Sequence, residues 1–146
     1  MKELDYWERL SELQLYSLER RRERYMVIYV WKIVRGLVPN MVDETYRVEF
    51  YYHVRRGRVC RVPPINNRAL ASIRTLREGS LSVRGPRSFN SLPKHLRNHD
   101  GTLLSFKNAL DNFLQGVPDT PNMPHYPMAA ASNSIGDQLT RLRLAD

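Results

Sequence analysis

The side chains that could perform catalysis are few, and they do not form the sets that catalysis requires. Polymerase chemistry by two metal ions needs carboxylates that converge on one site, usually with an adjacent Asp-Asp pair, and the sequence contains no such pair. Asp43 and Glu44 form the nearest acidic pair, but they follow Pro39 and Asn40 in a predicted turn, where helix capping is the ordinary explanation. We therefore expect a chain that is not an enzyme.

Histidine, cysteine and glycine offer no stronger candidate for a catalytic, metal or cofactor site. His95 and His99 have the spacing that places two imidazoles on one helix face, but residues 98–101 are typical of a turn and no Glu lies between the two histidines. Cys60 has arginines nearby, which could lower its thiol pKa, yet no partner for nucleophilic catalysis is specified. The 7 glycines are spread singly, unlike those of a phosphate loop. We predict no metal and no cofactor.

The strongest chemical feature is a concentration of positive charge in the middle of the chain. The formal net charge is +8, and residues 37–100 hold nearly all of the excess, with twelve basic and five acidic residues. Between Arg55 and Arg97 the only acidic residue is Glu78. Such a charge distribution attracts polyanions. We therefore predict a nucleic-acid-binding surface formed by Arg55, Arg56, Arg58, Arg61, Arg68, Arg74, Arg77, Arg84 and Arg87.

Two further patterns accompany the arginines. Aromatic residues lie beside the series, at Tyr46, Phe50, Tyr51 and Tyr52. Arginines and aromatics together can bind single-stranded nucleic acid through phosphate contacts and base stacking, although a solvated basic surface has the same composition. Prolines recur at intervals of three from Pro118 to Pro127, which matches one face of a polyproline II helix and is more often a stiff linker than a docking motif.

Hydrophobic periodicity and capping residues predict the helices. A short helix is expected from Trp7 to near Ser17. The next extends over residues 18–34, with Ser17 as its amino cap and Gly36 as its carboxyl cap. The second half of this helix is apolar almost all round, which indicates a buried core element. An amphipathic helix is expected over residues 103–114, between Thr102 and Gly116, and it must dock on the helix at 18–34.

The remaining segments are predicted to be extended, irregular or only briefly helical. Residues 47–54 and 79–83 are expected to be extended and to pair as a small ribbon, with an arginine-rich loop at 55–78 between them. Residues 85–93 indicate a helical turn that carries Phe89 and Leu92 on one face. Ser134 and Asp137 resemble a capping box at the start of a terminal helix.

Together these patterns predict a mainly α fold with a small β ribbon. The expected division is a helical domain at 7–115, a proline-rich linker at 116–133 and a short terminal helix at 134–146. A single cysteine excludes an internal disulfide, the amino terminus is charged, and no apolar run approaches the roughly 18 residues of a membrane span. We expect no membrane contact and an intracellular location, nuclear or cytoplasmic.

Several separate blocks fall in a defined order along the chain. They are Ser17 to Tyr25, Tyr29 to Ile33, Gly36 to Asn40, Arg84 to Pro93, Phe106-Lys107, Asp111 to Leu114, Val117 to Pro121, and Ser132 to Ser134. In combination they resemble the region that follows the reverse transcriptase domain in non-LTR (LINE-like) retrotransposon polyproteins. The resemblance covers nearly all of the chain from Trp7.

The resemblance implies a parent polyprotein with an amino-terminal endonuclease and a reverse transcriptase, of which this chain keeps only the part after the polymerase thumb. It lacks both enzymatic modules. The implied role is accessory: contact with RNA or DNA, and with the parent reverse transcriptase domain. One alternative is a structural or protein-interaction module, in which the helix at 103–114 and the apolar helix half cover a neighbouring domain. Another is a remnant without a selected function.

Overall fold

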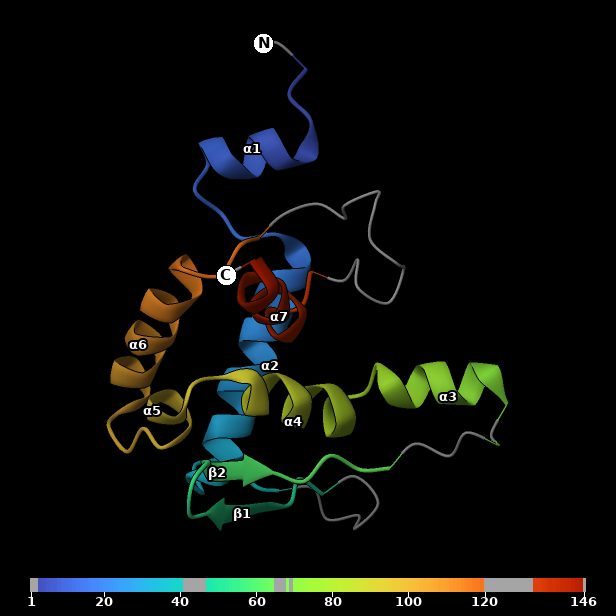
Figure 1. Cartoon of the computed structure of the whole chain (residues 1–146), viewed down its shortest axis with the longest axis vertical. Helices are drawn as coiled ribbons and strands as arrows, with labels where there is room; N and C mark the ends of the chain where they lie inside the picture. The colour runs from blue at the N-terminus through green and yellow to red at the C-terminus, as the bar shows by residue number, and fades with distance from the viewer. Residues whose placement is uncertain (1–2, 41–46, 65–67, 69, 120–132, 146) are drawn as a thin grey trace.

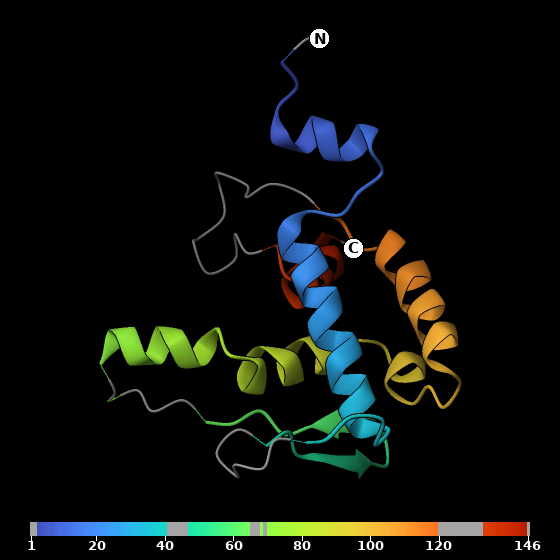
Figure 2. The ribbon, with the colours of Figure 1, turned by 180° about the vertical axis from the view of Figure 1, so that it is seen from behind.

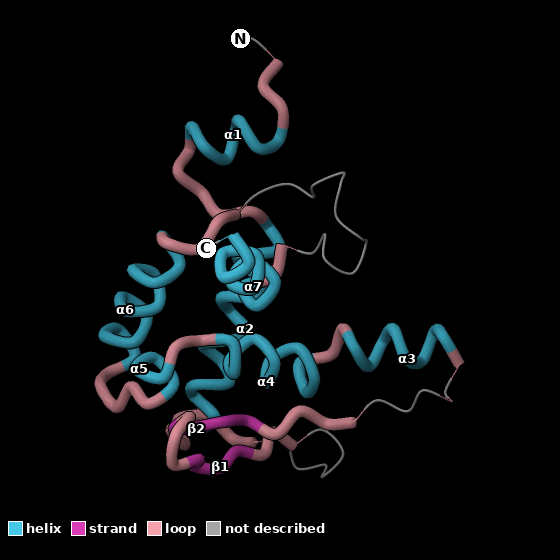
Figure 3. Tube along the Cα trace, in the orientation of Figure 1, coloured by secondary structure: helices cyan, strands magenta, loops and turns pink. Residues whose placement is uncertain are grey.

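The computed structural model describes residues 3–40, 47–64, 68, 70–119 and 133–145, and it shows helices around one central helix with a two-stranded hairpin at one end (Figure 1; Figure 3). The prediction of a mainly α fold with a small β ribbon is confirmed. Within these residues, none of the helices has both the length and the apolar character needed to cross a membrane. The elements are α1 (Tyr6–Glu12), α2 (Leu18–Val34), β1 (Phe50–His53), β2 (Gly57–Cys60), α3 (Ala71–Glu78), α4 (Leu81–Ser91), α5 (Lys94–Arg97), α6 (Leu103–Gln115) and α7 (Ile135–Ala145).

The predicted helix at 18–34 is confirmed with the same bounds, as α2. The Ser17 hydroxyl accepts the backbone N–H of Arg20 at 3.1 Å, which caps the amino end. At the carboxyl end Gly36 adopts a φ of +70°, a left-handed conformation that ends the helix at little steric cost for glycine. Both predicted end signals therefore act as expected.

The amino-terminal helix is shorter than predicted. The sequence predicts a helix from Trp7 to near Ser17, whereas α1 ends at Glu12. Its start is fixed by a capping box at Asp5. Gln14 has a φ of 53°, and a residue in this left-handed region cannot continue a right-handed helix. The chain therefore leaves the helical path before Ser17.

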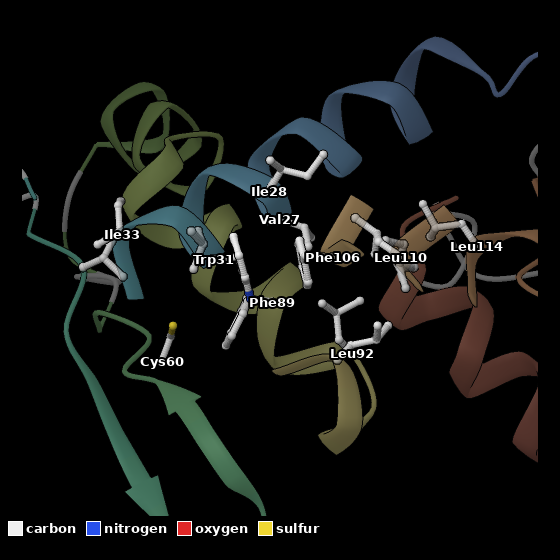
Figure 4. Close-up of a cluster of buried hydrophobic side chains, with 14 of the residues drawn as sticks. Val27, Ile28, Trp31, Ile33, Cys60, Phe89, Leu92, Phe106, Leu110 and Leu114 are labelled. Carbon is white, nitrogen blue, oxygen red and sulfur yellow. The ribbon is translucent and has the colours of Figure 1, made fainter. Parts of the chain in front are cut away.

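The core lies where the apolar half of α2 meets α6 and α4. Val27, Val30 and Trp31 are fully buried, and the Trp31 ring stacks on Phe106 of α6 with centroids 4.5 Å apart and an interplanar angle of 5° (Figure 4). The Trp31 indole N–H donates to the His99 carbonyl at 3.1 Å, so the polar atom of the ring is satisfied. Docking of the amphipathic helix on the central helix is thus confirmed.

The prediction that residues 79–83 are extended and pair with 47–54 is wrong. Residues 81–83 begin α4, which buries Val83, Pro86 and Phe89 at helical spacing. An alternation of polar and apolar residues over only four positions does not distinguish a strand from the start of a helix. The helix forms here because it buries its apolar side chains against α2. The backbone of α4 lies close to α2 at Gly85, since a Cβ added to this glycine would lie 2.9 Å from a methyl carbon of Val30.

One strand of the hairpin forms within residues predicted to be a loop. β1 lies inside the predicted extended segment, but its antiparallel partner is β2, from the 55–78 segment that is predicted to be irregular. The same segment contains α3, so that prediction is wrong in both places. Gly57, with a φ of +72°, permits the tight reversal, and a short connection costs less loop entropy than pairing with a distant strand.

The two edges of the hairpin differ. On β2, the backbone N–H and carbonyl of Cys60 bond the Asn90 side chain at 2.7 and 2.6 Å. The Arg58 N–H donates to Asn98 at 2.9 Å, and the Arg58 carbonyl accepts from Arg97 at 2.7 Å. Side chains from α4, from α5 and from the residue after α5 therefore occupy the place of a third strand. No such cap covers the outer edge of β1 in the described part of the chain.

The terminal helix begins at the predicted capping box and packs into the core. The Ser134 hydroxyl accepts the Asp137 backbone N–H at 3.2 Å and donates to its carboxylate at 2.8 Å. Ile135 is fully buried and belongs to the same hydrophobic cluster as α2 and α6. Both views of the ribbon place α7 beside the amino half of α2 (Figure 1; Figure 2).

A buried polar network fixes the segments on either side of residues 120–132. The Arg20 guanidinium, fully buried, donates to the carbonyls of Val117, Pro118 and Asn133. The Asp119 carboxylate accepts the Ser17 N–H and hydroxyl, and the Asn133 amide, each at 2.6 Å. Residues 121, 124 and 127 of the proline ladder lie outside the described residues. The division at 7–115, 116–133 and 134–146 stays a prediction.

Candidate nucleic-acid interface

Arg58 and Arg61, from the predicted site, form ion pairs in the described part of the chain. Arg58 of β2 contacts the Asp100 carboxylate at 2.6 Å, and Arg61 contacts Glu49 at 3.1 Å. Arg58 is partly buried, whereas the Arg61 pair is exposed and therefore weak. The cation at Asp100 also lowers the pKa of that carboxyl group, chiefly through the hydrogen bond from Arg58. The charges of Arg58 and Arg61 are therefore partly neutralised by Asp100 and Glu49.

Three other predicted arginines lie on or near α3 and are not gathered with the rest. Arg68 is exposed in a turn, Arg74 is half-buried in α3, and Arg77 lies in the same helix, with its side chain outside the described part of the chain. α3 projects away from the body of the molecule (Figure 1). The structure therefore does not bring these three together with the hairpin arginines.

Arg55 and Arg56 occupy the turn between β1 and β2. Both side chains are exposed, and neither takes part in an ion pair among the described residues. Their backbone N–H groups donate to Nδ1 of His53 at 3.2 Å each, which holds the turn. The fold thus presents two unneutralised guanidinium groups at one end of the hairpin.

Arg84 and Arg87 line a depression between α4 and α7. Its volume is about 430 Å³, and its other lining residues are Glu23, Ser88, Ser91, Ser134, Gly136 and Asp137. Arg87 is exposed and Arg84 half-buried, and neither is in an ion pair within the described chain. Three serine hydroxyls also line the depression, and each donates its proton within the protein: Ser88 to Glu23, Ser91 to the Ser88 carbonyl and Ser134 to Asp137.

A second depression, of about 650 Å³, continues the first. Ser91, Gly136 and Asp137 line both, so the two form one surface, here called the α4–α7 groove. Both volumes are in the range of ordinary ligand sites. Four cationic side chains line the second part: Arg56 from the hairpin turn, Lys94 and Arg97 from α5, and Arg143 from α7.

The groove carries an excess of positive charge. Six cationic side chains line it against two carboxylates, Glu23 and Asp137. Both carboxylates already have donors: Glu23 accepts the backbone N–H of Ile135 at 3.0 Å and the Ser88 hydroxyl at 3.2 Å, and Asp137 accepts from Ser134. Burial raises the pKa of Glu23, against the opposing effect of the Ile135 bond. Two carboxylates cannot balance six cations, so the groove has a net positive charge.

The cations of the groove do not have the same role. Arg97 is buried and donates to the carbonyls of Leu92 and Arg58 at 2.9 and 2.7 Å, so it holds the wall of the groove. Burial lowers its pKa. Arg56, Lys94 and Arg143 are exposed and can reach a ligand.

Lys94, Arg97 and Arg143 are absent from the predicted set. Lys94 and Arg97 belong to the same run of positive charge, and their position after Pro93 was a usable signal. Arg143 lies in a segment with a slightly acidic balance, and only the packing of α7 beside α4 brings it to the groove. Charge counted along the chain cannot detect that arrangement.

The cysteine and histidine candidates have ordinary structural environments. Burial raises the pKa of the Cys60 thiol to about 12, opposite to the lowering that nearby arginines could cause. His99 contacts the Ser105 hydroxyl at 3.1 Å, and His95 is exposed on α5. Within the described ranges, no three histidine, cysteine or acidic side chains are grouped as metal ligands would be.

No known protein family, curated protein or solved structure gives a significant match to this chain. The chemistry of the α4–α7 groove must therefore be inferred from its lining. Guanidinium and ammonium groups are donors that suit phosphate oxygens, with arginine able to bind in a bidentate manner. The groove has the chemical character of a site for a phosphate-bearing polyanion.

Proposed function

We propose that this chain is a non-catalytic, nucleic-acid-contacting accessory domain from the carboxyl-terminal end of a non-LTR retrotransposon polyprotein. The origin rests on the ordered sequence blocks described above. The binding role rests on the α4–α7 groove, where phosphates of RNA or DNA would lie. In the parent polyprotein such a domain would hold template or target near the reverse transcriptase.

One observation carries the binding role: separate elements converge to place six cations along a single groove. A solvated basic surface would scatter its charges, because repulsion between neighbouring cations has a cost in free energy. Here Arg56 from the hairpin and Arg143 from α7 line the same depression without a carboxylate partner among the described ion pairs. A polyanion would relieve that repulsion and release its own counterions.

The test is binding of the purified chain to RNA and DNA hairpins at two salt concentrations. We expect affinity to fall steeply with salt, and we expect Arg87→Gln, Lys94→Gln and Arg143→Gln, combined in one variant, to flatten the salt dependence. Each phosphate that is no longer neutralised should reduce the slope of log K against log salt by about 0.7 to 0.9. Fluorescence anisotropy with labelled hairpins measures both quantities.

A matched variant separates the groove from net charge. Arg21→Gln, Arg22→Gln and Lys107→Gln remove the same number of charges from α2 and α6, outside the groove. This control should retain most of the salt slope. Equal losses in the two variants, or no binding of the unmodified chain at low salt, would refute the proposal.

A second candidate function is an interaction module that covers a neighbouring protein domain. It is favoured by an apolar depression of about 310 Å³ on α2, whose lining is Tyr25, Met26, Ile28, Tyr29, Lys32 and Leu81. Exposed apolar surface of this kind often marks a protein contact. The apolar face of α6, in contrast, is covered by the chain's own core. Self-association on a sizing column, or binding of a hydrophobic dye, would favour this candidate.

A further inference from the structure

β1 exposes every one of its side chains, although three of the four are large aromatic groups. Phe50 is 47% exposed, Tyr51 51% and Tyr52 67%, and His53 is exposed as well. A strand normally buries alternate side chains on one face. Burial therefore does not explain why large aromatic residues occupy this strand.

The register shows how these rings are distributed. Tyr51 is opposite Val59 and Tyr52 is opposite Arg58, so consecutive aromatic side chains point to opposite faces of the hairpin. The strand therefore presents rings on both sides. The outer edge of β1 is open too. The backbone groups of Arg58 and Cys60 on β2 bond side chains on the far side from β1. In an antiparallel pair the residues opposite them, Tyr52 and Phe50, therefore direct their own backbone groups away from β2.

The aromatic strand is joined directly to the α4–α7 groove. Arg56, in the turn of the hairpin, lines the groove, and Tyr52 lies only a few residues away at the end of β1. A hairpin of four paired positions is about 13 Å long. A chain that leaves the groove past Arg56 would reach the hairpin, which offers Tyr52 on one face and Tyr51 on the other, with Arg55 in the same turn.

We propose that the hairpin is a stacking platform for unpaired bases, and that the chain selects single-stranded over duplex nucleic acid. This inference rests on the proposed function, because the groove supplies the phosphate contacts. The hairpin adds stacking of a base on Tyr52 at one face and on Tyr51 at the other. Bases in a duplex are stacked on one another and cannot reach these rings, whereas each base of a single strand can contribute stacking energy.

The side chains favour this occupant over a peptide that extends the sheet. A peptide strand would bond the open edge of β1 and place its side chains beside the rings as cross-strand neighbours, but its backbone would bring no charge to the neighbouring arginines. Bases contact those rings directly. The cations next to the strand, Arg55 and Arg56, then neutralise phosphates of the same ligand.

The test compares two single strands of equal charge, one with and one without bases, and adds a duplex. Anisotropy is measured with an oligodeoxythymidine strand, an abasic strand of the same length and a duplex. We expect the base-bearing strand to bind at least about tenfold more tightly than the abasic strand, the effect of one or two stacked bases. Tyr51→Ala with Tyr52→Ala should abolish that preference and leave binding of the abasic strand unchanged.

Two further variants test the role of the rings. Tyr51→Phe with Tyr52→Phe keeps the aromatic faces and should keep the preference. Tyr25→Ala with Tyr29→Ala removes two exposed tyrosines from α2 and should have no effect on it. Circular dichroism confirms that each variant is folded, which is expected because all four side chains are exposed.

The outcomes separate this inference from the proposed function. If the unmodified chain binds none of the three ligands at low salt, the proposed function fails. If it binds the base-bearing and abasic strands equally, with the groove variant still weakened, the groove stands and the stacking platform is wrong. Displacement of the strand by an acidic extended peptide, without any preference for bases, would assign β1 to a protein partner and overturn the platform.

Discussion

Arg20 and Arg56 are chemically identical side chains with opposite environments. Arg20 is fully buried at the amino end of α2, where it donates to three backbone carbonyls and lies 3.8 Å from the Glu23 carboxylate. Arg56 is exposed at the hairpin turn and lines the α4–α7 groove. The first is part of the fold, and the second is available to a ligand.

This difference shows that a formal charge is not a binding capacity. Of 23 basic residues, several are held by internal partners: Arg20 and Arg97 by carbonyls, and Arg24, Arg35 and Arg58 by carboxylates. Side chains held in this way interact with a polyanion less strongly than exposed cations such as Arg56 do. The comparison can be tested by removing one member of each kind and measuring stability and binding separately.

The largest effect is expected for Arg20→Ala. This substitution leaves the carbonyls of Pro118 and Asn133 without their donor and leaves Glu23 buried without its cation. Breaking a buried pair in this way typically costs about 3–5 kcal/mol. Urea denaturation followed by circular dichroism measures the free energy of unfolding. A loss below about 1 kcal/mol would mean that water replaces the guanidinium and that the network is not structural.

A smaller effect is expected for Arg97→Ala, which acts within the groove itself. Arg97 donates to the carbonyls of Leu92 and Arg58, so its removal should cost about 1–3 kcal/mol of stability. Arg56→Ala, in the same groove, should change stability by no more than about 0.5 kcal/mol. Urea denaturation of both variants, with binding to RNA and DNA hairpins measured alongside, tests whether Arg97 supports the fold and Arg56 does not. Equal stability of the two variants would contradict it.

The elements that sequence predicts well are those fixed by local signals. Ser17, Thr102 and Ser134 begin helices because each side chain bonds a backbone N–H within the next turn, and such bonds depend on only a few residues. Gly36 ends α2 for an equally local reason. The start of α4 is not predicted because no side-chain bond caps it at Ser80, and its helical state depends on burial against α2.

The groove is only half predictable for a similar reason. Arg56, Arg84 and Arg87 are identified from the charge of their segment, and all three line the groove. Nothing in the sequence shows that Arg143 joins them, because that requires α7 to pack beside α4. Nor does it show that Arg58 and Arg61 are paired with carboxylates. Tertiary contacts decide which cations remain available.

The smallest effect concerns Glu23, the acid that accompanies Arg20. Burial raises the pKa of Glu23 above its ordinary value of 4.5, so the folded chain takes up a proton at a pH where the unfolded chain is still ionised. Its contribution to stability is therefore fully present below pH 4.5 and is lost as pH rises through the raised pKa. For one proton the change cannot exceed about 1.4 kcal/mol per pH unit.

Glu23→Gln isolates this contribution, because glutamine has a similar shape and does not ionise. The free energy of unfolding of the unmodified chain, minus that of the variant, should rise as pH falls from neutral toward 4.5. Asp100, whose pKa is lowered by Arg58, changes stability in the opposite direction, but it is present in both proteins and cancels in the difference. Parallel pH profiles would show that the Ile135 N–H and Arg20 fully compensate the burial of the carboxylate. Arg20 would then hold a permanently ionised partner, and the buried arginine would differ from Arg56 even more sharply.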